Sequence, residues 1–315
     1  MNVNGKTISD LKFMQTWDRL KSASLVSQEL GLSLRNTYKR RRTIELAHDL
    51  SLQTLDSRSP TFIKREHMQR ADCEMENGVI VVGSDVHIWP DEESVAQAAF
   101  RKVIKQIKPQ LIVLNGDVFD GAQVSRWPKS GYGMKTPTVK QELDACRDYL
   151  DSLVKVSGGA KLWWTLGNHD MRFESRLANT VPEFEGVAGF SLKEHFPEWS
   201  MSISLFVNKN LMILHNWHNG IHATYNNTLK SGVSVCTGHL HRLQASSFSD
   251  YNGVRWGIDT GTLGETSGDH MSYGMDRPMN HCSGFAVLTV VDGQLIHPEF
   301  CAVQDGVAYF RGKPV

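Results

Sequence analysis

The spacing of apolar positions changes partway along this chain of 315 residues. In the first fifty residues, apolar side chains recur at helical intervals, as at Leu11, Met14 and Trp17, which predicts a helix over residues 10–21. From residue 78 onward, short continuous apolar runs alternate with longer amphipathic stretches. The short runs are typical of buried strands and the longer stretches of helices, so this second part predicts an α/β layer.

The expected elements of the second part fall into two groups. Strands and helices alternate over 78–82, 94–107, 110–114, 138–156 and 161–166. The last third is richer in strands, which are expected over 201–207, 210–214, 233–236, 243–249, 255–259, 284–291 and 295–302. A strand-rich second half packed on an α/β first half predicts two sheets face to face with helices outside, and therefore the α/β fold class.

Residues 1–50 are expected to form a small all-helical module. Gly31 ends a helix over 22–30, and Ser33 is placed to cap a further helix from Leu34. The stretch 23–42 resembles the helix-turn-helix of DNA-binding proteins in its small early residue, its Leu-Gly-Leu-Ser turn and its basic second helix. The resemblance implies that this helix meets the phosphates of DNA through Arg35, Lys39, Arg40, Arg41 and Arg42.

An alternative stays open for this module, since small helical hairpins with a basic face are also typical of oligomerisation or packing elements. The first fifty residues hold nine Lys and Arg against five Asp and Glu, a local excess that the zero net charge of the whole chain hides. Residues 51–77 are polar and mixed in charge, as expected of a linker, and they precede an expected large domain over 78–315.

Composition narrows the compartment and the chemistry. The five cysteines form no CxxC pair, which favours free thiols in a reducing compartment. The N-terminus has no basic-then-apolar signal pattern, and no run approaches the roughly 18 apolar residues of a membrane span. We therefore expect a soluble cytoplasmic protein with no membrane partner, in the host cytoplasm if a phage encodes it. Many of the 13 histidines cluster between His169 and His241, where metal chemistry would need them.

Five groups of polar residues follow the ends of apolar runs. They are Asp85 with His87, Asp117, Asn168 with His169, His215, and His239 with His241. Because α/β sheets bind their ligands at the carboxyl ends of strands, we expect these side chains to meet at one sheet edge. Sets of oxygen and imidazole ligands hold the metal pairs that hydrolyse phosphate esters.

The residue types indicate different roles within these groups. Asp117 has two oxygens and can bridge two metals. Asn168 offers a neutral oxygen that does not repel a phosphate. His169 can reach the substrate rather than a metal, and Asp170 is expected to hold its imidazole in the useful tautomer. Asp120, one short turn beyond Asp117, is expected to support the site rather than to bind a metal.

The order and spacing of the five groups, over residues 78–302, resemble the calcineurin-like metallophosphoesterase family. The resemblance implies a four-layer α-β-β-α sandwich of two mixed sheets. It implies one metal held by Asp85, His87, Asp117 and His241, and a second held by Asp117, Asn168, His215 and His239. In that family the fourth group often reads His-Gly, whereas here a glycine follows only at Gly220, which leaves His218 as an alternative to His215.

The mechanism expected from this ligand set starts with two divalent ions, about 3.5–4 Å apart, that share a bridging water and lower its pKa. The resulting hydroxide attacks phosphorus, and His169, as imidazolium, protonates the departing oxygen. Arg172, Arg242 and Arg126 are candidates to hold the phosphoryl oxygens. Manganese is the metal that the resemblance favours, with iron or zinc as alternatives.

The helical module makes DNA the expected substrate and partner, so the sequence favours a phosphodiesterase or nuclease. The overall layout resembles predicted phosphoesterases of phages and prophages, which supports a role in DNA metabolism by association. Two alternatives stay open: a phosphatase or cyclic-nucleotide phosphodiesterase for small molecules, and a DNA-binding regulator with an inactive phosphoesterase domain. The natural substrate, the direction of cleavage and the oligomeric state do not follow from the sequence.

Overall fold

The computed structural model describes residues 8–53, 69–126, 136–266 and 279–315. The chain divides into two compact units, residues 1–66 and residues 67–315, and each is described by itself.

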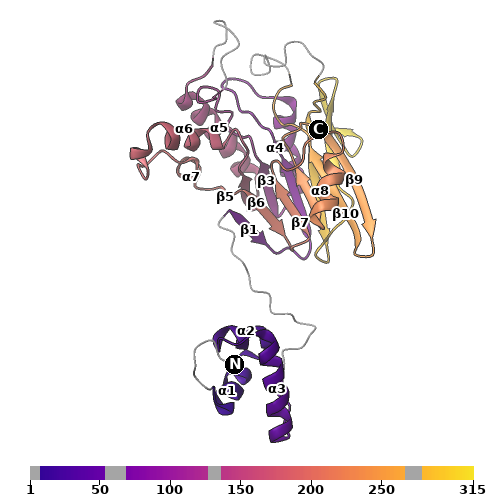
Figure 1. The fold of residues 1–315 in the computed structure, drawn as a ribbon. Helices are drawn as coiled ribbons and strands as arrows, with labels where there is room; N and C mark the ends of the chain where they lie inside the picture. The colour runs from indigo at the N-terminus through magenta and orange to yellow at the C-terminus, as the bar shows by residue number, and fades with distance from the viewer. Residues whose placement is uncertain (1–7, 54–68, 127–135, 267–278) are drawn as a thin grey trace. The chain divides into compact units, whose positions relative to one another are not determined.

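In its described residues, the first unit holds the three helices that the sequence predicts, α1 (Asp10–Leu20), α2 (Ala23–Glu29) and α3 (Leu34–His48) (Figure 1). Ser9 and Ser33 cap α1 and α3, because the hydroxyl of each accepts the backbone N–H three residues further on. The indole N–H of Trp17 donates to the carbonyl of Gln53 at 2.8 Å. The small apolar core contains Phe13, Trp17, Ala23, Val26, Ile44 and Leu52.

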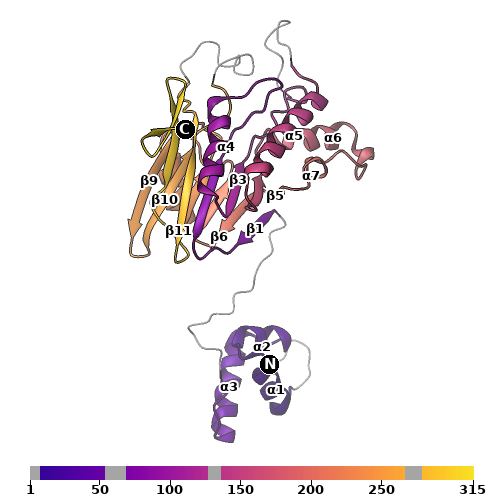
Figure 2. The same cartoon turned by 180° about the vertical axis from the view of Figure 1, so that it is seen from behind.

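The described residues of the second unit form two mixed sheets (Figures 1 and 2). The large sheet has, in spatial order, β15 (Lys313–Pro314), β14 (Val307–Phe310), β13 (Glu299–Gln304), β11 (Gly284–Val291), β2 (Gly78–Gly83), β3 (Leu111–Asn115), β4 (Lys161–Thr165) and β5 (Ser200–Ser202), with β12 (Gln294–Leu295) beside β11. The small sheet has β1 (Arg70–Cys73), β6 (Ser204–Val207), β7 (Leu211–Leu214), β8 (Ser234–Thr237), β10 (Gly253–Thr260) and β9 (Leu243–Asp250). Strands β2 to β5 run parallel to one another, as do β7 and β8.

Helices cover the outer face of each sheet. Helices α4 (Val95–Ile107) and α5 (Val139–Val156) lie on the large sheet, and α8 (Ala223–Ser231) lies on the small sheet, as Figures 1 and 2 show from opposite sides. The four-layer α-β-β-α sandwich is therefore confirmed. Three further helices follow β4: α6 (Met171–Thr180), the 3₁₀-helix η1 (Pro182–Phe184) and α7 (Leu192–His195).

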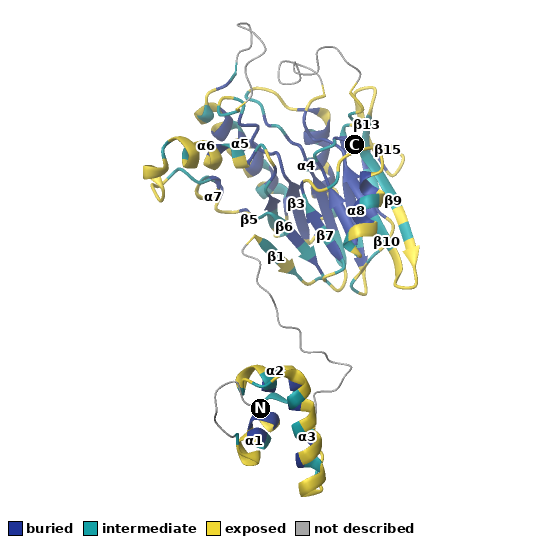
Figure 3. Ribbon diagram, viewed as in Figure 1, coloured by how far each residue is buried: buried dark blue, intermediate teal, exposed yellow. Residues whose placement is uncertain are grey.

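Strand β3 explains why a continuous apolar run predicts a buried strand. Its alternate residues Leu111 and Val113 pack in the core between the two sheets, while Ile112 and Leu114 pack under the helices. Both faces of the strand are covered, so the four residues from Leu111 to Leu114 are all apolar. Figure 3 shows the buried residues concentrated along the strands and the exposed ones on the outer faces of the helices.

Three expected boundaries are wrong. The strand expected over 201–207 is two strands, since β5 pairs with β4 in the large sheet and β6 with β1 and β7 in the small one. The chain changes sheets at Ile203, whose N–H donates to the carbonyl of Gln69. The strand expected over 295–302 divides into β12 and β13 around Pro298, which has no N–H to donate.

The third wrong boundary is that of the linker expected over 51–77, because β1 lies within it and pairs with β6. The large domain therefore begins before residue 78, and residues 54–68 of that linker lie outside the described part of the chain.

Candidate functional site

The five polar groups follow the carboxyl ends of five strands, as the sequence predicts. Asp85 and His87 follow β2, Asp117 follows β3, and His169 follows β4, all in the large sheet. In the small sheet, His215 follows β7, and His239 and His241 follow β8. The site therefore lies where the strand ends of the two sheets meet.

The chain turns sharply after three of these strands, β2, β3 and β8. Five residues of the polar groups have left-handed backbone angles, with φ between 42° and 69°: Asp85, His87, Asp117, His239 and His241. Residues other than glycine adopt this conformation at a cost of roughly 1–3 kcal/mol, and such strain clusters at functional sites. The side chains of successive strands are turned inward at this cost.

Glycines leave the room that the inward-facing side chains need. A Cβ atom on Gly116 would lie 2.3 Å from His215 Nδ1, and one on Gly167 would lie 2.2 Å from Asp117 Oδ1. Both distances are far shorter than a van der Waals contact. Each glycine is therefore required by the side chain of a different strand.

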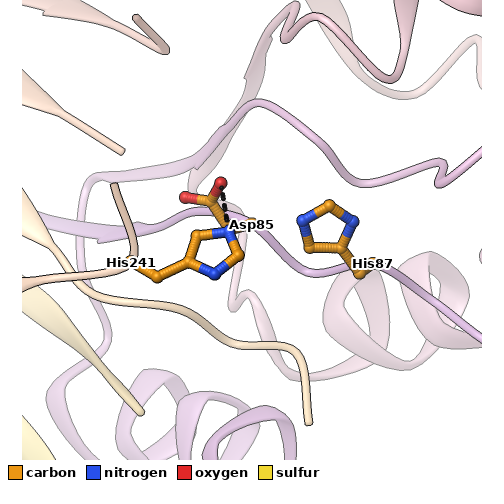
Figure 4. A group of neighbouring side chains, drawn as sticks. All are labelled: Asp85, His87 and His241. Atoms are coloured by element: carbon orange, nitrogen blue, oxygen red, sulfur yellow. Dashed lines mark ion pairs between the residues drawn. The ribbon is translucent and has the colours of Figure 1, made fainter. Parts of the chain in front are cut away.

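One group of potential metal ligands consists of Asp85, His87 and His241 (Figure 4), whose ligand atoms lie within 4.8 Å of one another. Asp85 is fully buried, and its Oδ1 lies 3.1 Å from His241 Nε2. Its other oxygen, Oδ2, accepts hydrogen bonds from the Ser84 hydroxyl and the His239 backbone N–H. Asp85 thus keeps Oδ1 directed at the centre of the group.

A second group consists of Asp117, His215 and His239, again within 4.8 Å. Asp117 Oδ2 lies 3.1 Å from His215 Nε2, and Asp117 Oδ1 accepts the His169 backbone N–H. Among the residues with defined positions, His218 belongs to no such group, and its ring stacks on Trp217 instead. The geometry therefore favours His215 over His218.

The side chain of Asn168 is exposed, and its role as a ligand stays a prediction.

Asp120 connects the first group to His169. Its Oδ1 lies 2.8 Å from His87 Nδ1 and 3.0 Å from His169 Nδ1. This leaves His87 Nε2 available for a metal. The expectation that Asp120 supports the site is confirmed, and it holds two imidazoles rather than one.

The prediction that Asp170 holds the His169 ring is contradicted. The buried Asp170 carboxylate accepts the backbone N–H groups of Asp117, Val118, Phe119 and Gly167 and the indole N–H of Trp164, at 2.8 to 3.0 Å. It is turned away from the ring because these donors surround it. Asp170 therefore fixes the loop after β3 to the loop after β4, and with it the position of Asp117.

His169 also belongs to a third group of possible ligands, with His87 and Asp117. Both of its nitrogens already have partners, however, because Nδ1 meets Asp120 and Nε2 meets Arg172 Nη2 at 2.7 Å. In this arrangement Nδ1 carries the proton and Nε2 accepts. Burial acts to lower the pKa of His169, but the Asp120 hydrogen bond and the Asp117 charge outweigh it, so the pKa is raised.

The three arginines expected to contact substrate have different surroundings. Arg172 lies at the site, since it also donates to the Asp120 carbonyl. Arg242 donates to the carbonyl of Gly220. Arg126 is exposed. A contact between any of them and substrate stays a prediction.

Two residues that the sequence analysis did not single out also shape the site. Glu142 accepts the backbone N–H groups of Gly121 and Ala122, just after Asp120, and burial raises its pKa to about 8. His281 Nδ1 lies 3.3 Å from His241 Nδ1, and burial lowers its pKa to about 4. Neither lies in a recognisable motif, so no sequence signal pointed to them.

The donor set fits divalent cations. Asp85 Oδ1 and His215 Nε2 are buried and have no hydrogen-bond partner within the described residues. Oxygen and nitrogen lone pairs that face each other at 3.1 Å, as in Asp85–His241 and Asp117–His215, need a proton or a cation between them. Carboxylate and imidazole ligands suit manganese, iron or zinc.

The pKa shifts of Asp85, Asp117 and His215 also indicate that the site favours positive charge. Burial acts to raise the pKa of Asp85 and of Asp117, but the neighbouring histidines outweigh it and hold both below the usual range. Burial acts to lower the pKa of His215, but Asp117 and Asp85 raise it to about 10. A proton on His215 thus occupies the place that a metal would take.

The structure divides the five basic residues proposed for DNA into two sets. Arg40 pairs with Asp10 and lies over the Phe13 ring, while Arg41 binds Glu45 and the Leu52 carbonyl and lies over the Trp17 ring. Arg40 and Arg41 thus help to hold the first unit together, and a contact of either with phosphates stays a prediction.

The other set remains on the surface of α3. Arg35, Lys39 and Arg42 are exposed, and Tyr38 is 49% exposed. These positions recur every three or four residues, so they lie on one side of the helix. We call Arg35, Tyr38, Lys39 and Arg42 the basic face of α3.

Comparison with known proteins gives a family match and several similar proteins. Residues 78–243 match the model of the calcineurin-like phosphoesterase family. The Gene 54 protein of Mycobacterium phage L5 is 28% identical over 245 residues, which cover 72% of this chain and 94% of that protein.

No helix in the described residues is both long and apolar enough to cross a membrane.

Two solved structures show more distant likeness. The phosphoesterase Yfce from E. coli matches with a TM-score of 0.34 and 13% identity, over 70% of this chain and 97% of that one. A protein serine/threonine phosphatase from Saccharomyces cerevisiae matches with a TM-score of 0.37 and 11% identity, over 78% and 86%.

Binding of a divalent cation at the second group should release about one proton at pH 7, because His215 must lose its Nε2 proton to become a ligand. Its raised pKa means that the proton competes until the pH exceeds about 10, so cation affinity should rise with pH over that range. Titration calorimetry in buffers of different ionisation enthalpy measures the release. A binding enthalpy independent of the buffer would contradict the prediction, and His215→Gln should abolish the dependence.

Asp170→Asn should destabilise the second unit by about 1–3 kcal/mol, because the amide turns an N–H₂ group toward backbone donors. It should also weaken cation binding, since the loop that carries Asp117 loses its anchor. Urea unfolding and calorimetry measure the two effects. The exposed Asp151→Asn is the matched control. If both variants unfold like the parent protein, Asp170 does not anchor the loops.

Proposed function

The chain belongs to the calcineurin-like phosphoesterase family, and we propose that it is a two-metal phosphodiesterase that cleaves DNA. As a family member it is a metal-dependent phosphoester hydrolase. The proposal that DNA is the substrate rests on the basic face of α3, where three cationic side chains are exposed. The neighbouring Arg40 and Arg41 instead bind other residues of the first unit.

Seven residues would hold the cations: Asp85, His87, Asp117, Asn168, His215, His239 and His241. When bound, two divalent ions supply a water nucleophile of lowered pKa and neutralise charge on the phosphoryl oxygens. We propose manganese as the metal, with iron or zinc suited to the same donors. The left-handed turns and the Asp170 anchor hold these side chains in place before substrate arrives.

His169 is proposed as the general acid that protonates the leaving oxygen. Asp120 holds its Nδ1, so Nε2 is the atom that must deliver the proton. Arg172 donates to that nitrogen in the structure. A phosphoryl group entering the site offers the guanidinium better acceptors. Arg172 then leaves Nε2 for the phosphoryl oxygens, and the raised pKa of His169 lets Nε2 take up a proton.

The DNA assignment rests on charge and on position along the chain. A row of Arg and Lys along one helix side follows the phosphates of a duplex, which bear one charge per about 1.7 Å of helix axis. The chain is similar to a protein of a mycobacteriophage, and we propose that it acts in phage DNA metabolism in the host cytoplasm. We propose that the first unit tethers the hydrolase to its substrate.

The deciding experiment compares three substrates with the manganese-loaded protein: a bis-ester, a mono-ester, and labelled single- and double-stranded DNA. DNA cleavage that disappears in His169→Ala supports the proposal and excludes a contaminating nuclease. Hydrolysis of small esters with DNA left intact would assign a small-molecule phosphoesterase. DNA binding without hydrolysis of any substrate would assign a regulator with an inactive hydrolase domain.

His169→Ala should keep both cations but lose about 10²–10⁴-fold in turnover, because the ring helps the leaving group without holding a metal. Titration calorimetry and initial rates measure the two quantities. His297→Ala, at an exposed histidine against Trp256, is the control for removing an imidazole. Loss of a cation from the His169 variant would make His169 a ligand instead.

Replacing Arg35, Lys39 and Arg42 together by alanine should reduce the salt dependence of DNA binding. Each lost phosphate contact lowers the magnitude of the negative slope of log K against log salt by about 0.9, so the loss of three contacts should reduce this magnitude by nearly 3. The control removes the same charge from exposed helix positions of the second unit, at Lys102, Lys105 and Lys230. Equal slopes in the two triple variants would rule out the basic face of α3 as the tether.

A further inference from the structure

We propose that His281 is a positioning residue of the metal centre, which accepts a hydrogen bond from the ligand His241 and fixes its tautomer. The two Nδ1 atoms lie 3.3 Å apart, and the ring centroids are 4.3 Å apart at an angle of 60°. The inference rests on the two-metal part of the proposed function and is independent of the DNA substrate.

The direction of this hydrogen bond follows from the other end of His241. Its Nε2 points at Asp85 Oδ1, the atom with which it would share a cation (Figure 4). A nitrogen that binds a metal carries no proton, so the proton of the neutral His241 ring is on Nδ1. His241 Nδ1 must then donate and His281 Nδ1 must accept, which leaves the proton of His281 on Nε2.

The same pattern holds at two other imidazoles of the centre. His87 has Asp120 Oδ1 at its Nδ1, and His215 has the carbonyl of Asn115 at its Nδ1, at 2.8 Å in both cases. Partners that hold the second nitrogen of a metal-binding histidine orient its ring and raise its basicity. His281 completes this set for His241.

His281 differs from Asp120 in carrying no negative charge. A carboxylate behind a ligand adds electron density and reduces the net positive charge of the site, whereas a neutral imidazole does not. The centre thus combines one charged partner and two neutral ones, the carbonyl of Asn115 and the ring of His281. This leaves more of the cations' charge for a phosphoryl group.

Backbone contacts fix His281 in register with His241. The N–H of Cys282 donates to the carbonyl of His241 at 2.7 Å, and the carbonyl of Cys282 accepts the N–H of Thr262. The residue lies beyond residues 78–243, the part that the family model matches. The family match thus includes the candidate ligand His241 but not His281.

The test compares His281→Leu, which removes the acceptor, with His281→Asn, whose amide oxygen can occupy the position of Nδ1. Manganese binding to the full chain is measured by titration calorimetry, together with the rise in Tm that saturating manganese produces. His281→Leu should weaken one of the two manganese sites about 10- to 100-fold, and His281→Asn should restore most of the affinity. His297→Leu should bind both ions like the parent protein.

Two results would overturn the proposal. The first is parent-like binding of both ions by His281→Leu. The second is an equal loss in the leucine and asparagine variants, which would mean that ring packing matters and the acceptor does not. Should leucine unfold the protein, alanine takes its place in the same comparison. The manganese affinities and Tm values are measured without DNA, so they do not depend on whether the protein is a nuclease.

Discussion

Two buried carboxylates of like charge, Asp85 and Asp117, impose the main constraint on this molecule. Both are almost inaccessible to solvent, and the charge of Asp117 acts to raise the pKa of Asp85. Burying two such groups together is tolerated only where positive charge lies between them. The surrounding histidines, the strained turns and the glycines all serve to bring imidazoles, and with them cations, to that point.

The cluster of candidate metal ligands was predictable because its residues lie just after apolar runs. A run such as 111–114 identifies the strand, and the strand's carboxyl end places Asp117 without any knowledge of long-range packing. His215 could be preferred over His218 for the same reason, since it follows β7 at once. The sequence was thus informative wherever function depends on a local position at the end of a strand.

Partners that arrive from distant parts of the chain were not predictable in this way. Asp170 stands beside His169 in sequence, yet its carboxylate accepts three backbone N–H groups from residues more than fifty positions away, so adjacency was misleading. His281 meets His241 although the two residues lie 40 positions apart in the sequence. The change of sheet at Ile203 also depends on pairing with β1 and β4. The local pattern of apolar and polar residues does not predict contacts between residues that lie far apart in the sequence.

The basic run at 39–42 shows an intermediate case. Charge alone groups Arg40 and Arg41 with Lys39 and Arg42, but the 3.6-residue period of a helix separates them onto different sides. Their cation–π contacts with Phe13 and Trp17 turn two of the four positive charges into elements of a core. Helical phase depends on sequence position alone, so the period of the helix is sufficient to divide this set into its two sides.

The first and second ligand groups each draw on both sheets, since Asp85, His87 and Asp117 come from the large sheet and His215, His239 and His241 from the small one. A cation bound by either of these groups would be coordinated by side chains of both sheets, and it would therefore link the two sheets at one edge of the sandwich. Sliding of the sheets against each other would separate these ligands, and loss of the cation would remove one link between the sheets at that edge. Occupancy of the site and the cohesion of the sandwich are for this reason a single linked equilibrium.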